Sequence, residues 1–218
     1  MNKRLGLLCT GVLILGLAGT AQATLIDRGN GLIYDDDLDI TWAANANING
    51  TMMNWDTAVA WAGGLSYGGY DDWRLPTTQQ PDASCDSQHN PGGGFPLQGY
   101  GYNCSGSELG HLFYTELAGT AGSSILNAAD PNGYLALFSN VQSDYYYWSG
   151  TEVAPKTSDA WFFYTYDGNQ NGYHKDNDFY AWVVRSGDVA GVPEPATLLL
   201  FGLGLAGLVV ARRDQSQR

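Results

Sequence analysis

The sequence is short of basic residues and of cysteine. It carries 10 lysines and arginines against 22 acids. Two of the acids and five of the bases lie in the terminal segments 1–23 and 192–218, so the middle of the chain keeps 20 acids and 5 bases, a formal charge of −15. Such a field repels nucleic acid, anionic lipid and sulfated glycans. Neutral ligands and divalent cations remain compatible with it.

The common catalytic signatures are also missing. The sequence has no Gly-x-Ser-x-Gly, no His-Glu-x-x-His and no phosphate-binding loop. Asp35, Asp37 and Asp39 alternate and would share one face of a strand, but no spacing singles out the carboxylate pair that glycoside hydrolysis requires. The three histidines are scattered, and His111 is expected to pack beside a helix. The sequence therefore predicts that the protein is not an enzyme.

Residues 1–23 have the order of a secretory signal peptide. Lys3 and Arg4 precede an apolar run over 5–18, and Ala21-Gln22-Ala23 follows, which predicts cleavage before Thr24. Signal peptidase would remove Cys9 with this segment. The sequence thus predicts a single exported domain over 24–191.

The C-terminal segment 192–218 has an order of its own. Val192-Pro193-Glu194-Pro195 precedes an apolar run over 196–211, which would span roughly 24 Å as a helix. Arg212 and Arg213 follow on the expected cytoplasmic side. An ordinary short membrane anchor would also read this way, but the order closely resembles the PEP-CTERM sorting signal. That resemblance implies processing by a membrane-embedded exosortase and a location in the cell envelope, cell surface or extracellular matrix of a Gram-negative bacterium.

Only Cys85 and Cys104 remain in the exported domain. In an oxidising envelope, two cysteines 19 positions apart most simply form a disulfide, worth on the order of 3 kcal/mol. A metal site is the weaker interpretation, because no third sulfur or well-spaced histidine accompanies them. Residues 79–104 are rich in Gly, Pro, Asn and Gln, and they are expected to form a long loop closed by this bond.

The remaining patterns predict an α+β domain. Residues 31–42 are typical of a strand, Asn54 can cap a helix that ends before Gly63-Gly64, and Ser105 with Glu108 forms a capping-box pattern ahead of a second helix. Aromatic and β-branched runs predict strands over 145–151, 159–167 and 179–186, the last two joined by a polar loop. The expected architecture is two helices packed on an antiparallel sheet.

Several short motifs, in this order, resemble the Lcl C-terminal domain family. They are DWRLPT (72–77), SEL (107–109), YWSGT (147–151), AWFFYTYDG (160–168) and WVVRS (182–186). Gly150 departs from the usual YWSST, and residues 79–104 look like an insertion. The resemblance covers 31–186 and implies a C-type-lectin-like fold, exported and of largely undefined function. In that fold Trp73 and Leu75 would point inward, Pro76 would fix a turn, and Arg74 would hold backbone carbonyls or a carboxylate such as Asp72 or Glu108.

Two sets of residues are candidate ligand sites. Asp167, Asn169, Asn171, Gly172 and Asp178 fit positions one, three, five, six and twelve of a calcium loop, although a hairpin loop selects the same residue types. Tyr67, Tyr70, Tyr100 and Tyr102 sit among glycines, where partly exposed rings could stack on neutral sugars or pack on their own loop.

These observations together predict an exported, non-catalytic surface or matrix protein. Its candidate partners are neutral polysaccharide and other surface proteins, with Ca²⁺ as a candidate cofactor. An enzyme of polysaccharide processing and a purely structural component of a biofilm are the alternatives.

Overall fold

A four-stranded antiparallel sheet joins the two ends of the described chain, residues 24–189 of this computed structural model. It contains β1 (Leu25–Gly29), β2 (Leu32–Asp35), β3 (Ile40–Ala43) and, from far along the chain, β9 (Val184–Ser186). The single strand predicted over 31–42 is wrong. Its acids form a turn, in which the backbone N–H of Leu38 donates to Asp35 and Asp39 has a φ of 51°, so the alternating acids share no strand face.

The second large sheet has three antiparallel strands. They are β6 (Tyr146–Glu152), β7 (Asp159–Tyr164) and β8 (Asn169–His174). The polar loop predicted over 168–178 is therefore mostly a strand, because β8 pairs with β7 along its whole length. The predicted strand over 179–186 shortens to β9. Its first part, around Phe179, instead exchanges backbone hydrogen bonds with Met53.

The first helix agrees with its sequence signals. α1 (Trp55–Gly63) begins after Asn54, whose side chain accepts from the N–H of Thr57, and it ends at Gly64. Ala58 and Ala62 bury one side of α1 against the β6–β8 sheet.

The second helix is shorter and less regular than predicted. α2 (Glu108–His111) continues directly as a π-helix, η1 (Leu112–Glu116). The predicted capping box is wrong: Ser107 is the cap, and the Glu108 side chain makes tertiary contacts instead. The predicted apolar stripe is confirmed, since Leu109, Leu112, Phe113 and Leu117 are all buried. Two 3₁₀ turns follow, η2 (Ile125–Asn127) and η3 (Tyr134–Leu137).

The insertion over 79–104 holds a small hairpin of its own, β4 (Ser87–His89) and β5 (Gln98–Tyr100). The predicted Cys85–Cys104 disulfide is present at its base. Gly110 lets α2 lie directly on this base, because a Cβ there would stand 1.8 Å from the carbonyl oxygen of Cys104.

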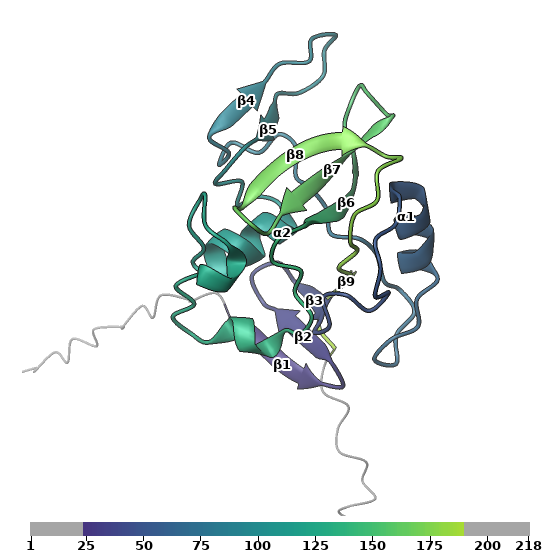
Figure 1. The fold of residues 1–218 in the computed structure, drawn as a ribbon, viewed down its shortest axis with the longest axis vertical. Coiled ribbons are helices and arrows are strands. Elements are labelled where there is room, and N and C mark those ends of the chain that lie inside the picture. Colours follow the sequence, from purple (N-terminus) through teal and green to yellow (C-terminus); the bar gives the residue numbers. More distant parts are fainter. Residues whose placement is uncertain (1–23, 190–218) are drawn as a thin grey trace, which may run out of the picture.

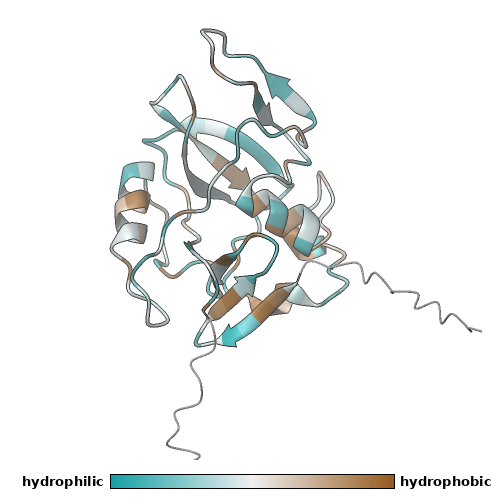
Figure 2. Ribbon diagram, turned by 180° about the vertical axis from the view of Figure 1, so that it is seen from behind, coloured by the Kyte–Doolittle hydropathy of each residue, from teal (hydrophilic) through white to brown (hydrophobic). Residues whose placement is uncertain are grey.

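Figure 1 shows α2 between the β6–β8 sheet and the β1–β2–β3–β9 sheet, with the β4–β5 hairpin projecting at the far end. Trp42 and Trp182, both fully buried, form an edge-to-face pair in the core beside α2. In Figure 2 brown, hydrophobic stretches lie on α2 and on the strands at the opposite end from the hairpin, which is largely teal and white. The α+β prediction is confirmed at the level of two helices with antiparallel sheets.

None of the helices between residues 24 and 189 has the length and apolar character that a membrane span requires. The predicted signal peptide over 1–23 and the predicted membrane helix over 196–211 lie outside the described residues.

Candidate functional site

The DWRLPT segment is held by a bidentate ion pair. Arg74 Nη1 and Nη2 each donate to a carboxylate oxygen of Glu108 at 2.7 Å, and Nη1 also donates to the Leu75 carbonyl at 3.1 Å. The backbone N–H of Thr77 donates to the same carboxylate at 2.6 Å. Of the two acids that the sequence offered to Arg74, the structure therefore selects Glu108. Asp72 pairs with Arg185 instead.

The same segment contacts three of the other four motifs. The backbone groups of Arg74 and Val184 exchange two hydrogen bonds of 2.9 Å, and the N–H of Gly150 donates to the Pro76 carbonyl at 2.8 Å. The N–H of Glu108 donates to the carbonyl of Thr77. Trp73 and Leu75 are buried, at 2% and 3% exposure. These contacts bring together motifs that are far apart in the sequence.

Arg74 lines a small hollow of about 250 Å³, together with Val59, Gly63, Trp73, Leu75, Thr77 and Gly150. That lining contains no acid. The guanidinium donates to Glu108 and to a carbonyl, so the contacts around it are those of a packing residue. That Arg74 binds no ligand remains a prediction.

The four loop tyrosines fall into two separate groups. Tyr67 packs edge-on against Trp73, with ring centroids 5.8 Å apart, and Tyr70 lies under the guanidinium of Arg185 at 4.2 Å. In the insertion, the Tyr102 hydroxyl donates to Asp167, while Tyr100 lines a hollow described below. All four are half-buried. They therefore form no common stacking surface.

The proposed calcium loop is wrong. Asn169, Asn171 and Gly172 lie along the strand β8, where the backbone extends rather than wrapping around an ion. Asp167 accepts from the N–H of Asn169, two residues on, and Asp178 lies beyond the end of β8. Oxygen ligands spread along a strand cannot converge as those of a calcium loop do.

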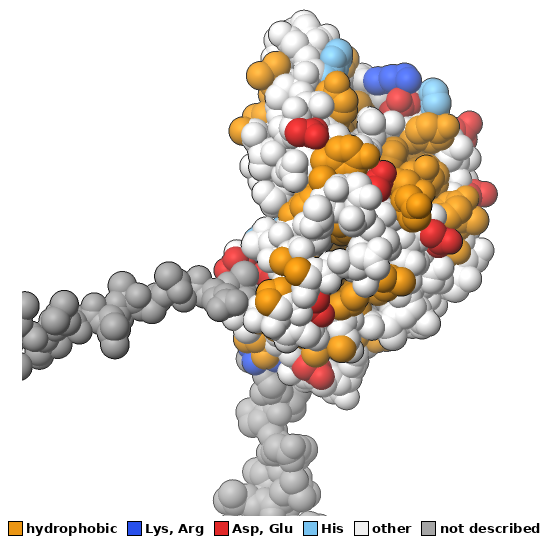
Figure 3. All heavy atoms as spheres, turned by 60° about the vertical axis from the view of Figure 1, so that its left-hand side comes forward, with side chains coloured by type: hydrophobic (Ala, Val, Ile, Leu, Met, Phe, Trp, Pro, Cys, Tyr) orange, Lys and Arg blue, Asp and Glu red, His pale blue; other side chains and the backbone are white. Residues whose placement is uncertain are grey.

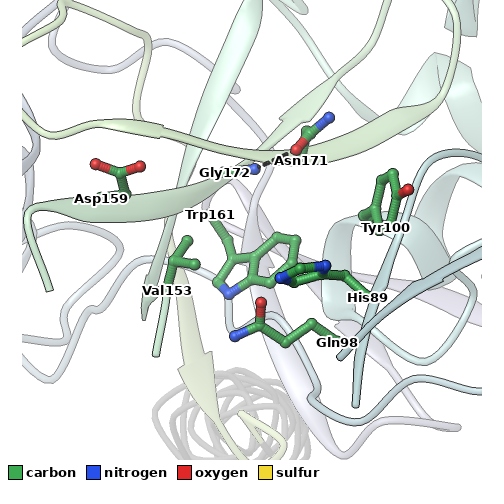
Figure 4. Close-up of a pocket in the computed structure, with 8 residues that line it drawn as sticks. All are labelled: His89, Gln98, Tyr100, Val153, Asp159, Trp161, Asn171 and Gly172. Atoms are coloured by element: carbon green, nitrogen blue, oxygen red, sulfur yellow. Dashed lines mark hydrogen bonds between the residues drawn. The ribbon is translucent and has the colours of Figure 1, made fainter. Parts of the chain in front are cut away.

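Residues of the insertion and the β6–β8 sheet line a hollow of about 260 Å³, which we call the hairpin hollow. Figure 4 shows the Trp161 indole at its centre, with His89 and Gln98 beside it from the hairpin and Asn171 opposite from β8. Trp161 and Gln98 are buried, and the Gln98 amide donates to the Ala154 carbonyl. The full lining is His89, Gln98, Tyr100, Val153, Asp159, Trp161, Asn171 and Gly172.

Asp159 gives the hairpin hollow a fixed negative charge. Burial raises the pKa of this carboxyl. Hydrogen bonds from Lys156 and Ser158 and the nearby His174 together lower it by more, so the pKa lies below its usual value. Lys156 Nζ stands 2.8 Å and His174 Nδ1 3.1 Å from the carboxylate. These partners occupy Asp159, which is therefore unsuited to act as a general acid.

Exposed and half-buried tyrosines gather on the β6–β8 sheet and at the ends of its strands. We call the set formed by Tyr145, Tyr146, Tyr164, Tyr166 and Tyr173 the tyrosine surface. Successive ring centroids from Tyr145 through Tyr146 and Tyr164 to Tyr166 stand 5.6, 4.3 and 5.5 Å apart. Tyr145, Tyr166 and Tyr173 are 37%, 53% and 49% exposed.

The surroundings of these rings are acidic. Burial raises the pKa of Tyr164, and the charges of Asp167 and Asp144 raise it further. On the face drawn in Figure 3, hydrophobic side chains lie in patches between red carboxylates, and lysine and arginine are rare.

Asp35, His111 and Glu116 meet in the interior, with one potential ligand atom of each within 4.8 Å of the others. Burial raises the pKa of Asp35 to about 6. Burial lowers the pKa of His111, but a hydrogen bond to Glu116 and the charge of Asp35 raise it above its usual value. The other group of this kind within residues 24–189 is Asp82 with Cys85 and Cys104, whose sulfurs are bonded to each other and so are not free thiolates.

The Lcl C-terminal domain model matches residues 31–185, which is most of the chain. The chain belongs to the Lcl C-terminal domain family. The match has nearly the bounds that the motifs predicted, and the contacts around Arg74 show that four of the five motifs meet in one place in this Lcl domain.

The PEP-CTERM protein-sorting motif matches residues 191–213. Pro193, Glu194, Pro195, Arg212 and Arg213 fall within the match and outside the described residues. The motif indicates exosortase-dependent export to the envelope or surface of a bacterium. Comparison of the Lcl chain with curated proteins and with solved structures gives no match.

Sequence reasoning missed the tyrosine surface and the interior acid cluster. Tyr146 begins β6 and Tyr164 ends β7, and the two lie opposite each other in the pairing of these strands. The residues that follow Tyr146 and precede Tyr164 are buried without alternation, so strand periodicity gave no signal for this surface. No sequence signal relates Asp35 to Glu116, because they lie 81 positions apart in the chain.

Proposed function

We propose that this Lcl domain is a non-catalytic module, held outside the cell, that binds neutral polysaccharide through the tyrosine surface. The ladder of tyrosine rings, with Tyr145 and Tyr166 exposed at its two ends, is the observation that carries this proposal. Aromatic faces stack on the apolar face of a sugar ring, and the tyrosine hydroxyls can donate to sugar oxygens. The acidic surroundings favour a neutral glycan over a sulfated or otherwise anionic one.

The sorting motif supports a setting in which such a ligand is abundant. Export by exosortase brings the domain to the cell surface. We propose that the host is a Gram-negative bacterium and that the domain resides in its polysaccharide matrix. We also keep the C-type-lectin-like arrangement as a prediction that rests on the family resemblance.

The direct test is affinity electrophoresis of the purified protein in gels that contain the producing strain's neutral exopolysaccharide. We expect retarded migration that is unaffected by chelator, since the calcium loop is absent. Replacing Tyr166 and Tyr173 together by alanine should weaken binding at least about tenfold, which corresponds to 1.4 kcal/mol. A double variant of Phe95 and Leu126, two exposed apolar residues outside the tyrosine surface, is the matched control and should bind normally.

Other outcomes would favour the alternatives. Release of soluble sugar from the polysaccharide, lost on changing one carboxylate, would contradict a non-catalytic role and indicate an enzyme. Neither retention nor product would favour a purely structural component of the biofilm. Equal weakening by the control variant would mean that the tyrosine surface is not the binding site.

A further inference from the structure

We propose that Asp35, His111 and Glu116 form a binding site for one divalent transition-metal ion, with Asp37 at its rim. The three residues come from the end of β2, the end of α2 and the end of η1. All three lie within the family match but outside the tyrosine surface, so this inference is independent of the polysaccharide proposal.

Glu116 is the residue that requires explanation. Its side chain has no exposed surface, and its Oε2 atom has no hydrogen-bond partner. The other oxygen, Oε1, stands 3.3 Å from His111 Nε2. A buried carboxylate oxygen without a partner is costly, because burial removes its water and nothing replaces it. A metal ion beside His111 would supply the partner that the protein does not.

The charges around this carboxylate do not balance. Asp35 is fully buried, and its oxygens accept only from the N–H of Leu38 and from Trp42 Nε1. Residues 24–189 contain five lysines and arginines, and each of them forms an ion pair with a different carboxylate: Arg28 with Asp188, Arg74 with Glu108, Lys156 with Asp159, Lys175 with Glu152 and Arg185 with Asp72. Within residues 24–189, the imidazole of His111 is thus the one basic group that lies beside the buried acids Asp35 and Glu116.

The π-helix places the ligands together. In an α-helix, side chains five positions apart point roughly 140° away from each other. η1 is instead closed by a hydrogen bond from the N–H of Leu117 to the carbonyl of Leu112, five residues back, and His111 and Glu116 then face the same side. π-Helical turns cost stability and occur frequently at functional sites.

The donor set selects the class of metal. One imidazole nitrogen with two or three carboxylate oxygens suits Zn²⁺ or Mn²⁺, whereas Ca²⁺ and Mg²⁺ take oxygen ligands almost throughout. Ligand atoms within 4.8 Å of one another can all come to about 2.1 Å from one ion if each moves by less than about 1 Å. Asp37, 42% exposed and 3.7 Å from His111 Nε2, gives the ion a path from solvent. The bound ion would join the β2–β3 turn to the α2–η1 segment.

The test uses the full-length, tag-free protein, stripped with EDTA and then incubated with Zn²⁺, Mn²⁺ or Ca²⁺. We expect about one equivalent of Zn²⁺ or Mn²⁺ to remain after desalting, a rise in Tm of several degrees, and no rise with Ca²⁺. In the Co²⁺-loaded protein, X-ray absorption should show one imidazole in the first coordination shell.

Two variants test the ligands. Glu116→Gln and His111→Gln should each weaken metal binding at least about 100-fold, because each removes a direct ligand. Asp82→Asn, which removes a buried carboxylate in the insertion, is the matched control and should bind the metal normally. Should a variant fail to fold, the metal stoichiometry and the Co²⁺ X-ray absorption spectrum of the wild-type protein still test whether the site exists. Absence of a stoichiometric ion, binding of Ca²⁺ in preference, or unchanged binding in folded Glu116→Gln would overturn the proposal.

Discussion

Two glutamates at the ends of one helical segment have opposite surroundings. Glu108, at the start of α2, accepts from both terminal nitrogens of Arg74 and from the N–H of Thr77. The carboxylate of Glu116, at the end of η1, has a hydrogen bond only with the imidazole of His111 within residues 24–189, and its other oxygen has no partner there. The side chains are 12% and 0% exposed, so burial does not distinguish them.

The number of partners distinguishes them. A carboxylate that is paired with a guanidinium and a backbone donor is satisfied by the fold and has nothing left to bind. A buried carboxylate that lacks such partners and has an excess of acid beside it is costly unless a cation joins it. The first arrangement identifies a structural pair, and the second is the basis of the proposed metal site.

The largest expected effect is on the paired glutamate. Glu108→Ala should lower the free energy of unfolding by about 3 kcal/mol, because it leaves Arg74 and the N–H of Thr77 without their partner. Urea denaturation measures this loss. Glu152→Ala, which breaks the exposed pair with Lys175, should cost less than about 1 kcal/mol and serves as the control. Equal losses would mean that the Arg74–Glu108 pair is no more than a surface pair.

Arg74→Lys tests the geometry of the pair without removing its charge. An ammonium cannot make two parallel bonds to Glu108 and also bond the Leu75 carbonyl, so the free energy of unfolding should fall by about 1–2 kcal/mol. Thermal denaturation and polysaccharide affinity are measured together. Unchanged melting with lost binding would instead make Arg74 a ligand-binding residue.

Glu116→Gln, without metal, sharpens the contrast. The amide keeps a hydrogen bond to His111 and removes an uncompensated charge, so the stability of the metal-free protein should change by less than about 1 kcal/mol, and upward. Urea denaturation in EDTA compares it with Glu108→Gln, which should be destabilised. A loss as large as that of Glu108→Gln would show that the fold itself needs the Glu116 charge.

The smallest expected effect is the pH dependence of stability that comes from the ion pair between Asp72 and Arg185. A hydrogen bond from Arg185 lowers the pKa of Asp72 below 3.8. A lowered pKa in the folded state stabilises the protein above about pH 4, and that stabilisation is lost as the pH falls through the folded value. The Asp72 side chain is 53% exposed, so we expect only a few tenths of a kcal/mol. Acid titration of Asp72→Asn against wild type should differ by that amount; a difference as large as that of Glu108→Ala would contradict the distinction between the two pairs.

The local predictions succeeded where one short segment contains the whole signal. Asn54 caps α1 because its side chain reaches the N–H of Thr57, three residues on. The same reasoning failed over 168–178. Asn, Gly and Asp occur both in turns and in edge strands, and here pairing with β7 makes the segment a strand. The capping box failed because Glu108 found a stronger partner in Arg74, 34 positions away.

The sequence by itself determined the C-terminal sorting motif, the family, the disulfide partners and the capped first helix, since each depends on composition, motif order or neighbours within one turn. Only the tertiary structure decided that Arg74 pairs with Glu108 rather than Asp72, that tyrosines of three strands form one surface, and that Asp35, His111 and Glu116 meet. These contacts join residues distant along the chain, and their distances follow from how whole sheets and helices pack.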